Sequence, residues 1–324
     1  MPDDLRYLID ALQDVPQEAG VAKPNPILIA DHVKRHFGGL TAVDVAHVEV
    51  QRGTITALIG PNGAGKTTFF NLLTGFDRPN EGSWTFDGHQ LAGVRPHKVA
   101  KYGMVRTFQL TKALSRLTVM ENMRLGAQHQ RGEKLYASVL PFLWSSQEKE
   151  ISERALSLLE SFNLAEKQDD LAGSLSGGQR KLLEMARALM VEPDMVMLDE
   201  PMAGVNPALT QSLLDHIRKV RDRGTTVLFV EHDMDMVRDI SDWVIVMAQG
   251  KVIAEGPPEE VMRMVRKARK KRPGGQWRLW AEALGLAFLG WLIVGGLWLA
   301  YQWQFAAPAP LPGWTEASPA GPSK

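Results

Sequence analysis

A glycine-rich segment of eight residues, from Gly60 to Thr67, constrains the fold of this chain more than any other feature. It follows the apolar run Thr54 to Ile59 and precedes a stretch with helical spacing, Thr67 to Thr74. A strand that enters such a turn and leaves as a helix is the context in which this spacing binds phosphate groups. Because all eight positions and both flanks agree, an accidental glycine-rich turn is the weaker interpretation.

The residue types of this segment indicate how a nucleoside triphosphate would be held. Glycines let backbone N–H groups point at the phosphates, and the helix N-terminus adds the positive end of its dipole. We expect Lys66 to neutralise the β- and γ-phosphates of ATP, the Thr67 hydroxyl to ligate Mg²⁺, and Thr68 to hold the α-phosphate. The residues expected to bind ATP are Gly60, Pro61, Asn62, Gly63, Ala64, Gly65, Lys66, Thr67 and Thr68.

A pair of adjacent carboxylates, Asp199 and Glu200, follows the buried-strand run Met195 to Leu198. Ligands of doubly wound sheets bind at the carboxyl ends of strands. We expect Asp199 to orient Mg²⁺ and Glu200 to polarise the attacking water as a general base. A solvated turn or a helix cap is the alternative for such a pair alone. The phosphate loop upstream favours the catalytic interpretation.

The segment Leu175-Ser176-Gly177-Gly178-Gln179 precedes a predicted helix, Arg180 to Met190. It places free N–H donors and the Ser176 hydroxyl at a helix N-terminus, which suits an anion. One chain needs no second anion site, so we expect Ser176 and Gly178 to reach the γ-phosphate bound to a partner chain. An ordinary N-cap followed by glycines explains the turn. It does not explain the accompanying motifs.

Apolar strands alternate with helical stretches from about residue 27 to 265, which predicts an α/β domain. The strands are nearly continuous apolar runs, as expected for a parallel sheet covered on both faces. Residues 110 to 172 lack such runs and show helical spacing instead, notably at Ile151, Ala155, Leu158, Leu159 and Phe162. We therefore predict an inserted helical subdomain over about residues 110–190.

Composition excludes several classes of function. The 37 basic residues balance the 37 acidic ones, so no global field favours a nucleic-acid partner. No cysteine is present, which excludes disulfides, cysteine-ligated zinc and a thiol nucleophile. The first 13 residues carry acidic side chains and no long apolar run, so they do not indicate a secretory signal.

These motifs, in this order, resemble the ATP-binding subunits of ABC transporters over about residues 27–265. The resemblance implies a RecA-like parallel-sheet core, an antiparallel β subdomain and the inserted helical subdomain. It implies that Gln109 contacts Mg²⁺ and the attacking water and couples the site to a membrane subunit. It also implies that His232 contacts the γ-phosphate and that the ring of Phe37 stacks on adenine, where tyrosine is usual.

The segment Ala203 to Pro207 matches the loop that lines the dimer interface in this family, although most members have a different sequence there. With the segments around Leu40, Arg106 and Met234, it resembles the branch that imports branched-chain amino acids and relatives such as urea or short amides. The resemblance implies a homodimer or a heterodimer with a second ATPase, permease subunits at the cytoplasmic membrane face, and indirectly an extracytoplasmic binding protein.

Three other functions are alternatives to this one. The ATPase of a lipopolysaccharide-export system shares the compact Ala203-Gly204-Val205 type of loop and is the alternative within transporters. A soluble ABC ATPase acting on ribosomes or DNA usually carries two phosphate loops or long coiled coils. A catalytically inactive regulatory subunit is disfavoured by the presence of Lys66, Glu200 and His232.

The two ends of the chain differ from this domain. Residues 1–26 are polar and predict a loosely held extension. Residues 266–278 read as a basic linker, and 279–303 as a candidate transmembrane helix, since Ala283 to Tyr301 is uncharged and about 30 Å long as a helix. A helix packed on protein is the alternative. Residues 304–324 are rich in proline and alanine and predict a disordered tail.

Overall fold

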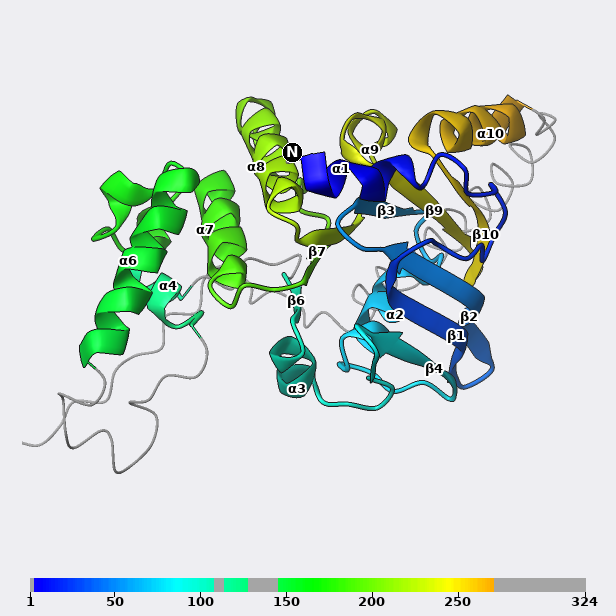
Figure 1. The fold of residues 1–324 in the computed structure, drawn as a ribbon, viewed down its shortest axis with the longest axis horizontal. Coiled ribbons are helices and arrows are strands. Elements are labelled where there is room, and N and C mark those ends of the chain that lie inside the picture. The colour runs from blue at the N-terminus through cyan, green and yellow to red at the C-terminus, as the bar shows by residue number, and fades with distance from the viewer. Residues whose placement is uncertain (1–2, 108–113, 128–144, 271–324) are drawn as a thin grey trace, which may run out of the picture. The chain divides into compact units, whose positions relative to one another are not determined.

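The computed structural model describes residues 3–107, 114–127 and 145–270 of the chain. The chain divides into two units, residues 1–265 and 266–324, and the second contributes only the end of one helix to the described residues. The first unit contains both sheets and the residues expected to bind nucleotide. Figure 1 shows its elements.

A six-stranded sheet forms the centre of the first unit, in the order β10-β9-β3-β8-β7-β6. Strands β3, β8, β9, β7 and β6 run parallel, and β10 is antiparallel to β9. Parallel strands end at the same edge, so the residues that follow β3, β7 and β8 share one edge. The strands are β3 (Ile55–Ile59), β6 (Met104–Arg106), β7 (Met195–Asp199), β8 (Thr226–Val230), β9 (Trp243–Ala248) and β10 (Lys251–Gly256).

Each central strand divides its side chains between two buried clusters. In β7, Val196 and Leu198 belong to the first cluster, whereas Met195 and Met197 belong to the second. The first cluster includes residues of α8 (Pro207–Asp222) and α9 (Met234–Ile240). The second includes α2 (Lys66–Leu73). Both faces of the sheet are therefore covered, as the apolar runs of the strands predict.

A second, antiparallel sheet has the order β2-β1-β4-β5 and confirms the predicted antiparallel subdomain. It packs in the same cluster as α2 through residues such as Val33 and Val45. Its longest pair, β1 with β2, is a hairpin that turns after Phe37. The strands are β1 (Pro26–Phe37), β2 (Leu40–Gln51), β4 (Glu81–Phe86) and β5 (His89–Gln90). The short helix α3 (Pro96–Lys101) follows.

The helical insertion between β6 and β7 is present as predicted. It contains α4 (Val119–Arg124), α6 (Ser145–Ser161) and α7 (Gly177–Leu189), with two 3₁₀ turns at Ala165–Lys167 and Ala172–Ser174. Ala155 and Leu159 of α6 are fully buried, and Ile151 packs partly buried against the same cluster. The spacing of apolar residues therefore predicted the buried face of α6.

The N-terminal segment is held more tightly than its polar sequence predicts. Helix α1 (Asp3–Asp10) and the turn after it bury Leu8 and Leu12 against the first unit. Lys23 and Glu255 form an ion pair whose side chains are 1% and 0% exposed. The prediction of a loosely held extension is wrong for this segment, because a few apolar residues and one buried pair suffice to anchor it.

The C-terminal predictions fall largely outside the described residues. Helix α10 (Pro258–Lys270) continues into the segment expected to be a basic linker. The candidate membrane helix at 279–303 and the tail at 304–324 lie outside the described residues, as does Gln109. Among the helices that the structure describes, none is long and apolar enough to cross a bilayer.

Candidate nucleotide site

The glycine-rich loop connects β3 to α2, as predicted. Pro61, Asn62 and Gly63 are exposed at its tip, whereas Lys66 is 8% exposed. The Lys66 ammonium donates to the carbonyl oxygens of Gly60 (2.7 Å) and Pro61 (3.0 Å). Burial lowers the pKa of Lys66, and attraction to Glu200 and Asp199 opposes that shift. The loop thus folds around the Lys66 ammonium.

Glycine is required at two positions of this loop. A Cβ at Gly60 would lie 2.1 Å from the carbonyl oxygen of Met247, and one at Gly65 would lie 2.3 Å from that of Ala42. Both glycines have positive φ, 153° and 97°. Gly65 is the N-cap residue of α2, so its conformation determines how the helix N-terminus meets the loop.

Asp199 and Glu200 lie at the carboxyl end of β7, as predicted. Asp199 ends the strand and is 5% exposed. Glu200 follows with a φ of 46°, a left-handed conformation that is unusual for a residue with a side chain. Its N–H donates to the carbonyl oxygen of Val230 at the end of neighbouring β8 (3.1 Å). Residues held in this way cluster at functional sites.

Arg106 joins Asp199 to the phosphate-loop helix, which the sequence did not indicate. Its Nη2 donates to Oδ2 of Asp199 (2.7 Å), and its Nη1 donates to Oδ1 of Asn71 in α2 (2.7 Å). The guanidinium also lies over the ring of Phe70, 5.5 Å from its centre. Arg106 therefore connects β6, β7 and α2 at the edge where the site residues meet.

The oxygen donors expected for Mg²⁺ suit that ion. Asp199 offers a carboxylate and Thr67 a hydroxyl, and Mg²⁺ prefers oxygen ligands. Within the described residues, Arg106 is the hydrogen-bond donor to Asp199 and it uses Oδ2, which leaves Oδ1 for a metal or its water. Thr67 is exposed at the start of α2. These two residues fit the cation, whereas Gln109 lies outside the described residues.

His232 follows β8 as predicted, and its imidazole is 66% exposed. The preceding residue, Glu231, is buried, with its side chain 2% exposed. Its carboxylate accepts hydrogen bonds from the N–H groups of Met202 (3.1 Å) and His232 (3.2 Å). Burial raises the pKa of Glu231, and the two N–H groups oppose that shift. Glu231 thus connects the histidine to the loop that follows Glu200.

The expected signature segment forms a capped helix start on the surface. The Ser176 hydroxyl accepts from the N–H of Gln179 (3.3 Å), and the Gln179 side chain accepts from the N–H of Ser176 (3.0 Å). Ser176 is exposed and Gln179 is half-buried, whereas Leu175 and Gly178 are buried, and Gly177 has open space around it. The ordinary capping role is therefore present.

Phe37 lies at the tip of the β1–β2 hairpin and is 48% exposed. The guanidinium of Arg35 lies over its ring, 4.5 Å from the centre. Arg35 is held in turn by Asp77, at 2.8 and 2.9 Å. The aromatic ring expected to stack on adenine is thus supported from one face by a cation.

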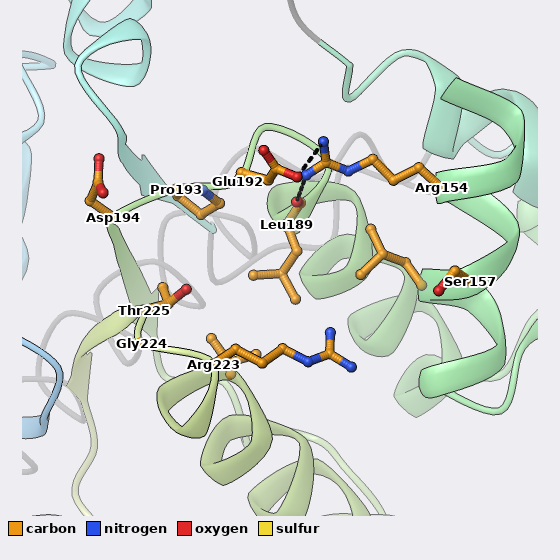
Figure 2. Close-up of a pocket in the computed structure, with 11 residues that line it drawn as sticks. Arg154, Ser157, Leu189, Glu192, Pro193, Asp194, Arg223, Gly224 and Thr225 are labelled. Atoms are coloured by element: carbon orange, nitrogen blue, oxygen red, sulfur yellow. Dashed lines mark hydrogen bonds and ion pairs between the residues drawn. The ribbon is translucent and has the colours of Figure 1, made fainter. Parts of the chain in front are cut away.

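Several cavities lie elsewhere in the described part of the first unit. The pocket of Figure 2, about 490 Å³, is lined by Asp194 before β7, Thr225 before β8, and Arg154 and Ser157 of α6. It therefore lies at the amino ends of the strands, opposite the edge that carries Asp199. Its size does not make it the nucleotide site, because none of the motif residues lines it.

A second, more apolar groove of about 290 Å³ has Thr107 and Leu114 among its lining residues. Leu114 and Leu125 border it and are 48% and 58% exposed. Val105, Ala188 and Val191 add to its apolar lining. The charged residues that line it are Arg106, Glu184 and Arg187. It joins strand β6 to helices α4 and α7.

Comparison with known proteins agrees with this geometry. Residues 43–203 match the family model described as ABC transporter. The chain is 42% identical over 236 residues to the probable branched-chain amino acid transport ATP-binding protein LivG of Archaeoglobus fulgidus, covering 73% of this chain and 91% of that protein. It is 42% identical over 242 residues to the high-affinity branched-chain amino acid transport ATP-binding protein BraF of Pseudomonas aeruginosa, covering 73% and 93%.

Solved structures show the same fold. A nucleotide-free ATP-binding cassette from an ABC transporter aligns with a TM-score of 0.65 at 38% identity, covering 75% of this chain and 95% of that one. The ADP conformation of such a cassette aligns with a TM-score of 0.64 at 39% identity, covering 72% and 92%.

Proposed function

Since the chain belongs to the ABC transporter family and is an ATP-binding ATPase subunit, we propose that it drives an importer of branched-chain amino acids or related small amides. ATP is hydrolysed at two composite sites in a dimer of ATP-binding subunits. The named relatives at about 40% identity support the choice of substrate.

One observation carries the catalytic part of this proposal. Lys66 follows β3, Asp199 ends β7 and Glu200 comes directly after it, so the three residues lie at the carboxyl edge of the parallel sheet. His232 follows the strand between β3 and β7 at the same edge. A phosphate-binding cation, a metal-binding carboxylate, a general base and a histidine are the groups that phosphoryl transfer to water needs.

Each of these groups has one role in ATP binding or hydrolysis. Lys66 and the loop N–H groups hold the β- and γ-phosphates, and Phe37 stacks on adenine. Thr67, Asp199 and Gln109 would hold Mg²⁺, which would neutralise charge on the phosphates. Glu200 accepts a proton from the attacking water, and His232 donates to the γ-phosphate.

The composite-site proposal makes Ser176 act on ATP held by the partner chain. Mixing two inactive variants tests it, because Lys66→Ala disables the phosphate loop and Ser176→Arg disables the signature segment. A mixed dimer then has one site with an intact loop from one chain and an intact signature segment from the other. We expect the mixture to regain ATP hydrolysis that neither variant shows alone. If the mixture stays as inactive as its parts, ATP is not sandwiched between chains.

We place the permease contact at the groove lined by residues of β6, α4 and α7 and their flanks. Leu114 and Leu125 expose apolar surface there, and Arg106 connects the groove to Asp199. Leu125→Asp should uncouple transport from hydrolysis, with ATPase activity of the isolated chain unchanged and transport lost. Normal transport in that variant would move the contact elsewhere.

Uptake measurements test the direction of transport and the substrate class. Deleting the gene should abolish uptake of labelled leucine by intact cells, and restoring the gene with Glu200→Gln should not rescue it. Unchanged leucine uptake together with retained surface lipopolysaccharide would overturn the importer assignment. Loss of surface lipopolysaccharide with normal leucine uptake would identify the export alternative instead.

The uncharged run from Ala283 to Tyr301 is the basis for a further part of the proposal, a membrane anchor beside the permease. The basic cluster Arg266 to Arg272 would keep its amino end on the cytoplasmic side. A chain ending at Arg272 should leave the membrane fraction of permease-free cells. If it stays bound as firmly as the full chain, the run is not an anchor.

A further inference from the structure

A half-buried lysine of helix α7 contacts the loop that carries Glu200. The Lys181 ammonium donates to the carbonyl oxygens of Glu200 (3.3 Å), Pro201 (2.9 Å) and Ala203. An ammonium has three protons to donate, and here all three have acceptors within one turn of backbone. Burial lowers the pKa of Lys181, and attraction to Glu231, Glu184 and Glu200 opposes that shift.

The loop needs such support because its backbone is strained. Glu200 has a φ of 46°, a left-handed conformation that is unfavourable for a residue with a side chain unless its surroundings hold it. Its N–H is fixed by Val230, and its carbonyl oxygen accepts from Ala203 (3.1 Å) and from Lys181. Removing the lysine would leave this carbonyl with a weaker set of partners.

A buried carboxylate also holds this loop. Glu231, directly after β8, accepts a hydrogen bond from the N–H of Met202 (3.1 Å). The loop from Glu200 to Ala203 is thus fixed by a cation at its carbonyl groups and by a carboxylate at an N–H group. We call Lys181 and Glu231 the loop clamp.

We propose that Lys181 is a positioning residue, which keeps Glu200 directed at the attacking water and joins it rigidly to α7. Helix α7 begins at the signature segment, and Lys181 lies five positions after Ser176. Ser176 would contact the partner's ATP and Lys181 contacts the chain's own Glu200, so the helix links the two. This step rests on the proposed composite sites. The loop and the helix would then move together when ATP binds, and hydrolysis would depend on both.

Steady-state kinetics of Lys181→Met tests the assignment, since methionine keeps most of the volume and removes the donors. We expect kcat to fall about 10- to 100-fold with little change in KM or in the affinity for a fluorescent ATP analogue. Lys181→Arg, which retains several donors, should recover part of the loss. Lys149→Met on α6, a residue 79% exposed, is the matched control and should behave as the unmodified chain.

A double-variant cycle separates positioning from a general structural role. In a Glu200→Gln background, Lys181→Met should reduce the residual kcat no further, because the lysine acts through Glu200. An equal fold-loss in both backgrounds would overturn the proposal, as would loss of nucleotide affinity in Lys181→Met. If Glu200→Gln itself hydrolyses ATP normally, the proposed function fails, which is a separate outcome from failure of the lysine's role.

Discussion

Arg106 and Asp199 form an ion pair in which each side chain is only 5% exposed and Nη2 lies 2.7 Å from Oδ2. The two residues are 93 positions apart in the chain, and the pair joins strand β6 to strand β7 at the carboxyl edge of the parallel sheet. Asp199 is therefore held in place before any metal binds. Glu200 directly follows Asp199, and its N–H is held by the carbonyl oxygen of Val230.

Replacing Arg106 with methionine should destabilise the chain, because it leaves a buried carboxylate without its cation. Breaking such a pair costs about 3–5 kcal/mol in free energy of unfolding. Urea unfolding followed by circular dichroism measures the loss. Arg218→Met is the control, since the pairs of Arg218 with Asp215 and Asp239 are more exposed and should contribute about 1 kcal/mol or less. Equal effects of the two substitutions would contradict the importance of the buried pair.

Gly65→Ala should impair both stability and nucleotide binding. The added Cβ would lie 2.3 Å from the carbonyl oxygen of Ala42, and φ is 97°, so the loop must shift. We expect the affinity for a fluorescent ATP analogue to fall at least about tenfold, since the N–H groups of the loop leave their positions. Gly39→Ala is the control, because a Cβ there meets nothing within 4 Å. Unchanged affinity in Gly65→Ala would show that the loop tolerates the side chain.

The N-terminal segment should contribute measurably to stability. Lys23 donates to Glu255, and Glu255 also accepts from Trp243 (2.8 Å) and from the N–H of Gly20 (2.7 Å). Lys23→Met should lower the free energy of unfolding by about 3 kcal/mol, because Glu255 stays buried without its cation. Adding Glu255→Gln should recover part of the loss. An unchanged free energy of unfolding in Lys23→Met would show that this ion pair does not anchor the segment.

His216 should make stability depend on pH. The imidazole is 3% exposed and stacks on Phe162, with ring centres 4.4 Å apart. Burial lowers the pKa of His216 in the folded state, and Lys219 adds to the shift. The unfolded chain then binds the proton more tightly, so stability falls as pH drops from about 6.5 toward the folded pKa, and is flat above.

His216→Phe should remove that part of the pH dependence, because the ring stays and the titrating group is lost. Urea unfolding at a series of pH values from 5 to 8 measures the slope, at most about 1.4 kcal/mol per pH unit for one group. His97→Phe, at an exposed position, is the control and should keep the slope of the unmodified chain. The same slope in His216→Phe would assign it to other groups.

Local sequence patterns predicted the strands and turns that carry the site. They did not predict the contacts between side chains that are distant in the sequence. The apolar runs before Gly60 and Asp199 identified β3 and β7, because a strand covered on both faces must be apolar throughout. The contacts of Arg106 and Lys181 join segments that are distant in sequence, and no local pattern states which distant group an arginine or lysine will reach. The buried anchor at Lys23 was missed because its partner Glu255 lies 232 positions away in the chain.

The measurement that tests the account most directly is ATP turnover by the purified chain and its Glu200→Gln variant, with Mg²⁺ present. We predict that the variant binds ATP with the affinity of the unmodified chain, loses at least about 100-fold in kcat, and accumulates as an ATP-bound dimer on size-exclusion chromatography. Turnover within about twofold of the unmodified chain, in a variant that binds ATP normally, would contradict the assignment of Glu200 as the general base.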